Sequence, residues 1–217
     1  MKTKNKINKN FIVSLGVAFL CLLLFAFFPR EEANNFQQIV VSAAFLLLVP
    51  GLYIKIVLKI SLSEFGVQEG YWRKGLIWMG VSFVFVFLLF YVFYQYVGFS
   101  EKYSLPQAVA ADFSYFVFYE IFLVGVFAAM YEFFFRGFVM GIFFEKIKIN
   151  AIFAQFSVFV LFLIFFDSFD WNSAPYMITA LFAGIIAYKS HSLLYSFAFT
   201  WIVIVISDAI FIKLISS

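Results

Sequence analysis

The chain has 217 residues and a net charge of +3, and only 12% of its residues are charged. Hydrophobic residues make up 65% of the chain, and phenylalanine alone occurs 36 times. A soluble domain of this length could not bury so much apolar surface, so the composition predicts an integral membrane protein whose first partner is the lipid bilayer. The single cysteine, Cys21, excludes a disulfide framework and a thiolate metal cluster within the chain. We expect no nucleic-acid partner.

Seven apolar stretches follow one another along the chain, each a candidate for a membrane-spanning helix of about 20 residues. They cover residues 11–28, 39–58, 76–97, 116–135, 151–166, 176–188 and 193–215. The fourth could extend to residue 144, and the sixth is short enough to be tilted or partly re-entrant. The predicted fold class is an all-α polytopic helical bundle with about seven transmembrane helices, which forms a single membrane domain over residues 1–217.

Basic residues are distributed unevenly between these stretches, and cytoplasmic loops normally carry the excess of Lys and Arg. The basic N-terminus and first apolar stretch are not followed by a small-x-small cleavage site, which predicts a retained span and not a signal peptide. With the N-terminus inside, ten basic residues fall on cytoplasmic segments, and only Arg30, Lys102 and Lys213 fall outside. This bias predicts a multi-pass protein of the cell membrane with a cytoplasmic N-terminus and an external C-terminus.

The fourth stretch contains charges in an otherwise apolar run. Between Ser114 and Phe144 the only charged residues are Glu120, Glu132 and Arg136. A charge at membrane depth costs at least about 2.5–3.5 kcal/mol, so it usually marks a functional site that faces the bundle interior. Glu132 and Arg136 are also four residues apart in the order that favours a helical ion pair. A functional site and a purely structural ion pair are therefore both open interpretations.

The residues Glu132-Phe-Phe-Phe-Arg136-Gly137 resemble the Glu-Glu-x-x-x-Arg-Gly motif of the CPBP family, the CAAX-protease and bacteriocin-processing membrane proteins. The segment 66–75, with the pattern Gly-x-x-x-Gly-x-Trp-Arg-x-Gly, is similar to the segment before that family's core. Its aromatic and basic residues also suit the membrane interface. The resemblance covers residues 65–210 and divides the chain into a two-span region, 1–64, and a CPBP-like core, 65–217.

The resemblance implies four helices around an intramembrane cavity. In such proteins the first glutamate of the motif activates a water molecule with the help of a histidine on the next span. A second histidine and an asparagine on a later helix complete the site, with a metal ion. Carried over to this chain, the motif matches Glu132 and Arg136 and places Tyr131 at the first glutamate. Where the next-span histidine is expected, near residue 166, the nearest polar residue is Asp167.

The last motif of the family falls in the stretch 193–215, where the register places Thr200 and Ile204 at its two positions. Asp208 follows on the same helix face, so Thr200, Asp208 and Asp167 are the candidate cavity-lining residues. The sole histidine, His191, is predicted to be a solvated loop residue. One histidine without a cysteine partner does not provide the ligands of a standard zinc site. We therefore predict no metal-ligating residues, although the acidic residues could offer oxygen ligands to a hard cation.

Three functions are compatible with these residues. The first is a divergent CPBP-type protein with impaired or absent peptidase activity that binds a membrane protein or peptide, in which Arg136 could hold a carboxylate. The second is an active CAAX-type intramembrane endopeptidase that uses Glu132 as base and Tyr131 as oxyanion donor. Only this hypothesis requires a divalent metal such as zinc as cofactor. The third is a small transporter or channel subunit, whose pathway the intramembrane charges would mark.

Overall fold

The computed structural model describes residues 10–29, 35–97, 105–165 and 173–215, and the regular structure in these ranges is entirely helical. The first described helix is α2 (Phe11–Phe27). A continuous helix follows, made of α3 (Asn35–Ser42), η1 (Ala43–Leu48), α4 (Val49–Leu52) and η2 (Tyr53–Leu58). The 3₁₀ turn η3 (Leu62–Phe65), α5 (Trp72–Val97) and α7 (Gln107–Ala111) come next, before a long helix in the middle of the chain. After it come η6 (Lys148–Asn150), α11 (Ala151–Phe165), α12 (Ala174–Ser190) and α13 (Leu193–Ile215).

The middle of the chain is one long helix that includes the predicted extension to residue 144. It consists of α8 (Phe113–Phe118), η4 (Tyr119–Val124), α9 (Gly125–Tyr131), η5 (Glu132–Val139) and α10 (Met140–Ile147). The segments η4 and η5 are π-helical, as are η1 and η2. Glu120 is the second residue of η4, and Glu132 is the first of η5. Both buried glutamates of this helix therefore lie in π-helical turns, which hold more residues than α-helical turns and are frequent at functional sites.

Four helical runs in the described residues are long and apolar enough to cross a membrane, as predicted for a multi-pass membrane protein. They are Phe36–Leu58, Trp72–Phe93, Phe113–Phe165 and Leu193–Lys213. The helix Phe11–Phe27 is apolar but shorter. The run Phe113–Phe165 contains two of the stretches that the sequence separates, because the helix α11 begins directly after the turn η6. Many large hydrophobic side chains on these helices face outward, as expected where lipid replaces water.

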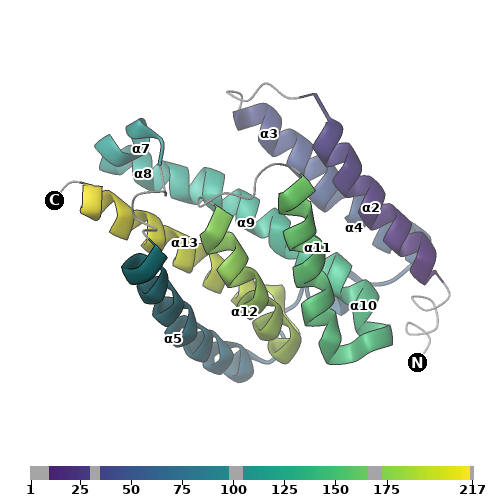
Figure 1. Ribbon diagram of the computed structural model, residues 1–217. Helices are drawn as coiled ribbons and strands as arrows, with labels where there is room; N and C mark the ends of the chain where they lie inside the picture. The colour runs from purple at the N-terminus through teal and green to yellow at the C-terminus, as the bar shows by residue number, and fades with distance from the viewer. Residues whose placement is uncertain (1–9, 30–34, 98–104, 166–172, 216–217) are drawn as a thin grey trace.

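The long helix lies between two groups of helices (Figure 1). On one side, α2 and the helix 35–58 pack with α11 around Phe134, Phe135 and Phe138 of η5, which are fully buried. On the other side, α5, α12 and α13 enclose a second core that includes Phe199 and Val203 of α13. Because α13 contacts both α9 and η5, it is the helix that meets the buried charges of the long helix.

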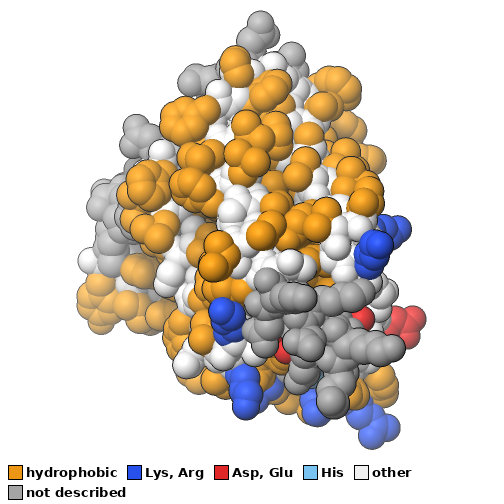
Figure 2. All heavy atoms as spheres, turned by 90° about the vertical axis from the view of Figure 1, so that its right-hand side faces the viewer, with side chains coloured by type: hydrophobic (Ala, Val, Ile, Leu, Met, Phe, Trp, Pro, Cys, Tyr) orange, Lys and Arg blue, Asp and Glu red, His pale blue; other side chains and the backbone are white. Residues whose placement is uncertain are grey.

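One end of the bundle is basic. Helix ends at this end carry Lys59, Arg73, Lys146 and Lys189, and Lys146 lies 3.8 Å from the ring centroid of Phe11 at the start of α2. We call it the basic end. In Figure 2, Lys and Arg side chains gather toward one end of the visible face, beyond an area covered by hydrophobic side chains. This separation is the one expected where apolar helices leave a bilayer.

The glycine-rich segment before α5 is held against the turn between α12 and α13 at the basic end. The N–H of Leu193 donates to the carbonyl of Gly66 (2.8 Å), and the N–H of Tyr71 donates to the carbonyl of Ser190 (2.7 Å). Gly70 has a φ of +61°, and a Cβ at this position would overlap the carbonyl oxygen of Ser190. Glycine is therefore required here by both conformation and space. The segment also exposes Tyr71 and Trp72, as predicted for interfacial aromatic residues.

Candidate functional site

The charged residues of the motif form a buried ion pair. Arg136 Nε lies 3.6 Å from Glu132 Oε1, and the two residues are only 3% and 1% exposed. This separation is an ion-pair distance that exceeds the range of an N–H···O hydrogen bond. Among the described residues, neither Arg136 Nε nor Glu132 Oε2 has a hydrogen-bond partner. The pair is therefore neutral overall but incompletely satisfied.

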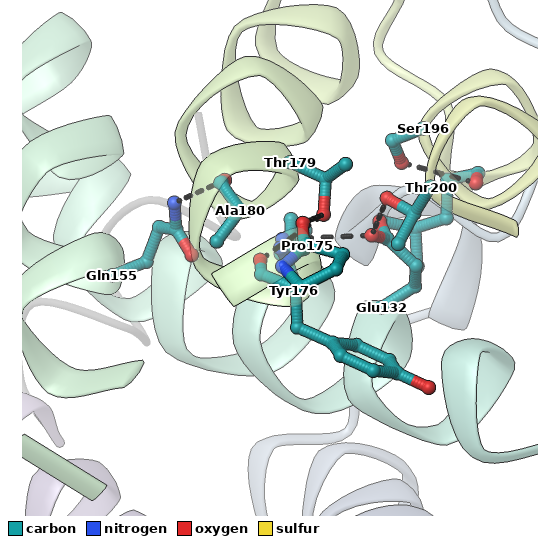
Figure 3. Close-up of polar contacts among 10 residues, drawn as sticks. Glu132, Gln155, Pro175, Tyr176, Thr179, Ala180, Ser196 and Thr200 are labelled. Carbon is teal, nitrogen blue, oxygen red and sulfur yellow. Dashed lines mark hydrogen bonds and ion pairs between the residues drawn. The ribbon is translucent and has the colours of Figure 1, made fainter. Parts of the chain in front are cut away.

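A hydroxyl from the last helix completes this group. Thr200 Oγ1 donates a hydrogen bond of 3.0 Å to Glu132 Oε1, and the contact is buried (Figure 3). Thr200 is the residue that the family register places at the first position of its last motif. A hydrogen bond to an ionised acceptor contributes about 1.5–3 kcal/mol, so this contact also ties the long helix to α13. We refer to Glu132, Arg136 and Thr200 as the inner site.

Tyr131 points in a different direction from its neighbour Glu132. Its ring stacks on Phe135 (centroids 6.0 Å apart) and meets Phe159 of α11 edge-on at 6.2 Å. Adjacent residues of a helix point about 100° apart, which directs Tyr131 to α11 and Glu132 to α13. The guanidinium of Arg136 also reaches α11, where its Cζ lies 5.6 Å from the ring centroid of Phe159. The tyrosine thus belongs to an aromatic cluster beside the inner site.

Asp208 pairs with the other glutamate of the long helix. Asp208 of α13 is near enough to Glu120 for the two carboxyl groups to influence each other. Both residues are 2% exposed, and neither Glu120 oxygen receives a hydrogen bond from an N–H or a hydroxyl of the described residues. Trp201 Nε1 donates to the Glu120 main-chain carbonyl at 2.9 Å. We call Glu120 and Asp208 the carboxyl pair.

The inner site and the carboxyl pair lie at different depths. Residues 120 and 132 are separated by a distance of about 18 Å along an α-helix. The sequence identifies Glu120, Glu132, Thr200 and Asp208 individually. Their grouping into two layers follows only from the helix packing. Asp167, the remaining candidate, lies outside the described residues.

A cavity of about 130 Å³ opens at the basic end, and Arg136 lines it. Its lining includes Gly137 and Gly141 of the long helix, and Phe65 packs so closely there that a Cβ on Gly141 would lie 2.7 Å from its ring. The exposed residue His191 lines the cavity from the turn between α12 and α13. Sequence reasoning missed this cavity. The available signal was the spacing of two glycines directly after Arg136, which lets another segment approach the helix closely.

Sequence reasoning also missed two buried polar residues of the neighbouring helices. Gln155 of α11 is fully buried, donates through Nε2 to the carbonyl of Ala180 at 3.2 Å, and packs against Gly184. Thr179 of α12 donates to the carbonyl of Pro175 at 2.7 Å (Figure 3). Both residues are polar interruptions of apolar stretches, which is the signal that could have identified them. Their contacts connect or shape helices, and neither contact involves the inner site.

The donor atoms of the inner site do not suit a zinc ion. Zinc prefers several nitrogen or sulfur ligands, whereas Glu132 has a guanidinium and a hydroxyl as neighbours. Within the described ranges, no three His, Cys, Asp or Glu residues lie close enough to hold a metal ion. Comparison with protein-family models, with curated proteins and with solved structures finds no match to this chain. The CPBP resemblance therefore stays a prediction.

Proposed function

We propose that this chain is a divergent CPBP-type protein of the cell membrane that binds a membrane protein or peptide through the cavity at Arg136 and does not cleave it. In this proposal the chain crosses the membrane seven times with its N-terminus in the cytoplasm, and the basic end faces the cytoplasm. The observation that carries the proposal is a guanidinium, almost fully buried, that lines a cavity at the basic end.

The position of the cavity supports binding from the cytoplasmic side. It lies among the segments that carry the excess of basic residues, which is the side that the positive-inside rule assigns to the cytoplasm. A ligand that enters from this side meets exposed backbone and polar side chains first and Arg136 last. Arginine is well suited to such a position because its planar fork binds carboxylate and carbonyl groups in a defined orientation.

The inner site argues against hydrolysis. A general base must lie within hydrogen-bonding reach of the water that it activates. Glu132 is 1% exposed and does not line the cavity, and Tyr131, the suggested oxyanion donor, packs its ring against the rings of α11. The one observation that favours a protease is the unpartnered Oε2 atom of Glu132, so an active endopeptidase is kept as the second candidate.

The two candidates differ in what becomes of a bound protein. We would place a photo-crosslinking amino acid at Gln68, which lines the cavity, and as a control at Ile77, which is 64% exposed on the apolar surface of α5. Binding without cleavage predicts that the variant with the crosslinker at position 68 forms adducts with a full-length partner protein in cells. The variant with the crosslinker at position 77 should form no adduct of the same mass. Adducts that contain a shortened partner, and that contain the full-length partner when Glu132→Gln is introduced, would instead support the protease. Equal adducts at both positions would remove the proposed function.

A further inference from the structure

The helices α5 and α12 lie side by side and form a seam on the outside of the bundle (Figure 1). They run in opposite directions, because α5 begins at the basic end and α12 ends there. At this end Lys189 Nζ lies 5.3 Å from the ring centroid of Trp78. Seven residues away on each helix, the rings of Phe85 and Phe182 stack with their centroids 6.3 Å apart. Seven residues are about two helical turns, so the two contacts follow one another along the seam.

Two lysines mark the basic end of this seam. Lys74 shares a face of α5 with Trp78 and Phe85, since the three positions point within about 40° of one another. Its Nζ lies 4.9 Å from the ring centroid of Tyr71. A ring holds an ammonium group from one side but offers no acceptor oxygen to its three N–H donors. Among the described residues, no carboxylate forms an ion pair with Lys74 or Lys189. Both therefore suit an anion from outside the chain.

The main chain fixes the position of these two lysines relative to each other, although they are far apart in the sequence. The N–H of Tyr71 donates to the carbonyl of Ser190, and this bond joins the start of α5 to the end of α12. Arg73 adds a third cation, whereas residues 66–75 contain one carboxylate, Glu69. The local charge is therefore positive, and an anion that binds here does not have to bring the two helices together.

Away from the lysines the seam is apolar. Phe85 is 53% exposed on a helix that is long and apolar enough to cross a membrane, and Phe182 is partly exposed. A ligand that fits the whole seam therefore has an anionic head and a hydrocarbon chain. A phospholipid has both, and basic pockets between transmembrane helices bind anionic headgroups. A zwitterionic headgroup suits the site less well, because the lysines repel its cationic part.

We propose that the seam between α5 and α12 binds an anionic phospholipid, whose phosphate lies between Lys74 and Lys189 and one of whose acyl chains lies along Phe85 and Phe182. Trp78 then sits at headgroup level, where tryptophan is enriched in membrane proteins. This site is separate from the one in the proposed function, because none of these residues lines the cavity at Arg136. Its failure would leave the proposed function standing.

The test uses the full chain in a neutral detergent and native mass spectrometry, which identifies each bound lipid by its mass. The probes are dioleoylphosphatidylglycerol and dioleoylphosphatidylcholine, which have the same acyl chains and differ in net charge. We expect the first molecule of phosphatidylglycerol to bind at least about tenfold more tightly than phosphatidylcholine, equivalent to about 1.4 kcal/mol. Glycerol 3-phosphate has the charge without the chains, and it should not displace the lipid at the same concentration.

The double variant Lys74→Gln/Lys189→Gln should reduce this preference to less than about threefold. Its control, Lys59→Gln/Lys146→Gln, has the same net charge but changes lysines of other helices at the basic end, and it should keep the preference. Lys74→Gln alone changes an exposed position and should already weaken the preference, should the double variant not fold.

Three results would overturn the inference. Equal losses in the two double variants would show that the net charge of the basic end, and not the seam, attracts the lipid. Equal binding of the two lipids by the wild-type protein would show that the lysines do not select a headgroup. Displacement of phosphatidylglycerol by glycerol 3-phosphate would assign the lysines to a soluble phosphate compound.

Discussion

The inner site and the carboxyl pair place the same residue type in two different environments of one helix. Glu132 and Glu120 both lie in π-helical segments of the long helix and both approach α13. Glu132 has a cation and a hydroxyl donor beside it, whereas Glu120 has a second carboxyl group. A neighbouring cation stabilises a buried carboxylate, whereas a second carboxylate at the same depth repels it. Burial alone therefore does not make an intramembrane glutamate a charged site.

The strongest test of this contrast is the removal of the cation from the inner site. Arg136→Met leaves Glu132 buried without its counter-ion, which should lower the free energy of unfolding by about 3–5 kcal/mol. Unfolding in detergent with increasing SDS, followed by circular dichroism, measures this loss. Lys55→Met is the matched control because it removes an exposed cation from another apolar helix. Losses of similar size in both variants would show that the ion pair has no special role.

The hydroxyl donor should matter less than the cation. Thr200→Val keeps the shape of the side chain but removes the hydrogen bond to Glu132, with an expected loss of about 1.5–3 kcal/mol in the free energy of unfolding. Thr200→Ser restores the donor and should recover most of the stability. Thr179→Val provides a comparison, because its hydroxyl bonds only to carbonyls of its own helix. If Thr179→Val were the more harmful change, the contact between Thr200 and Glu132 would not be stabilising.

Removal of both charges of the inner site should be milder than removal of one. The double variant Glu132→Gln/Arg136→Met leaves no uncompensated charge, and we expect it to lose less than about 1.5 kcal/mol of unfolding free energy. The double-mutant cycle requires Glu132→Gln alone as the fourth measurement. A double variant that is as unstable as the two single changes added together would mean that the two side chains are not coupled.

The smallest effect is expected at the carboxyl pair. Glu120→Gln replaces the carboxyl group with a neutral amide of similar shape, so the free energy of unfolding should change by no more than about 1 kcal/mol. Asp208→Asn should behave in the same way. By contrast, Glu132→Gln leaves Arg136 without its counter-ion and should be clearly destabilising. A severe effect of Glu120→Gln would show that this glutamate is ionised and has a cationic partner.

Much of the helical architecture could be predicted because apolar length is a direct signal. The last stretch was predicted as residues 193–215, and α13 covers Leu193–Ile215. The third, predicted from residue 76, begins earlier at Trp72, since the basic residues that precede the apolar run are helical too. Apolar length could not show how short the connection between the fourth and fifth stretches is: α10 ends at Ile147, α11 begins at Ala151, and α11 packs back against α10 and η5. The charges around residue 146 suggested a loop, whereas a short 3₁₀ turn is sufficient.

The candidate site was predictable residue by residue but not as an arrangement. Glu132 and Arg136 were apparent because charges are rare in apolar stretches, and their four-residue spacing indicated a pair. The partnership of Glu120 with Asp208 could not be predicted, since it depends on how two helices far apart in the sequence are aligned along their axes. The cavity at Arg136 likewise requires a distant segment, 64–68, to lie against the long helix.

The π-helical segments of the long helix have a consequence for how this protein can change. A π-helical turn accommodates more residues than an α-helical turn, so residues after it face directions that an unbroken α-helix would not give them. Deleting one residue between Glu132 and Arg136 would close the π-turn to an α-turn and leave Gly137 and Gly141 in the cavity wall. The same deletion in α9, which is regular α-helix, would rotate everything that follows by about 100°. A one-residue deletion should therefore be tolerated better in η5 than in α9.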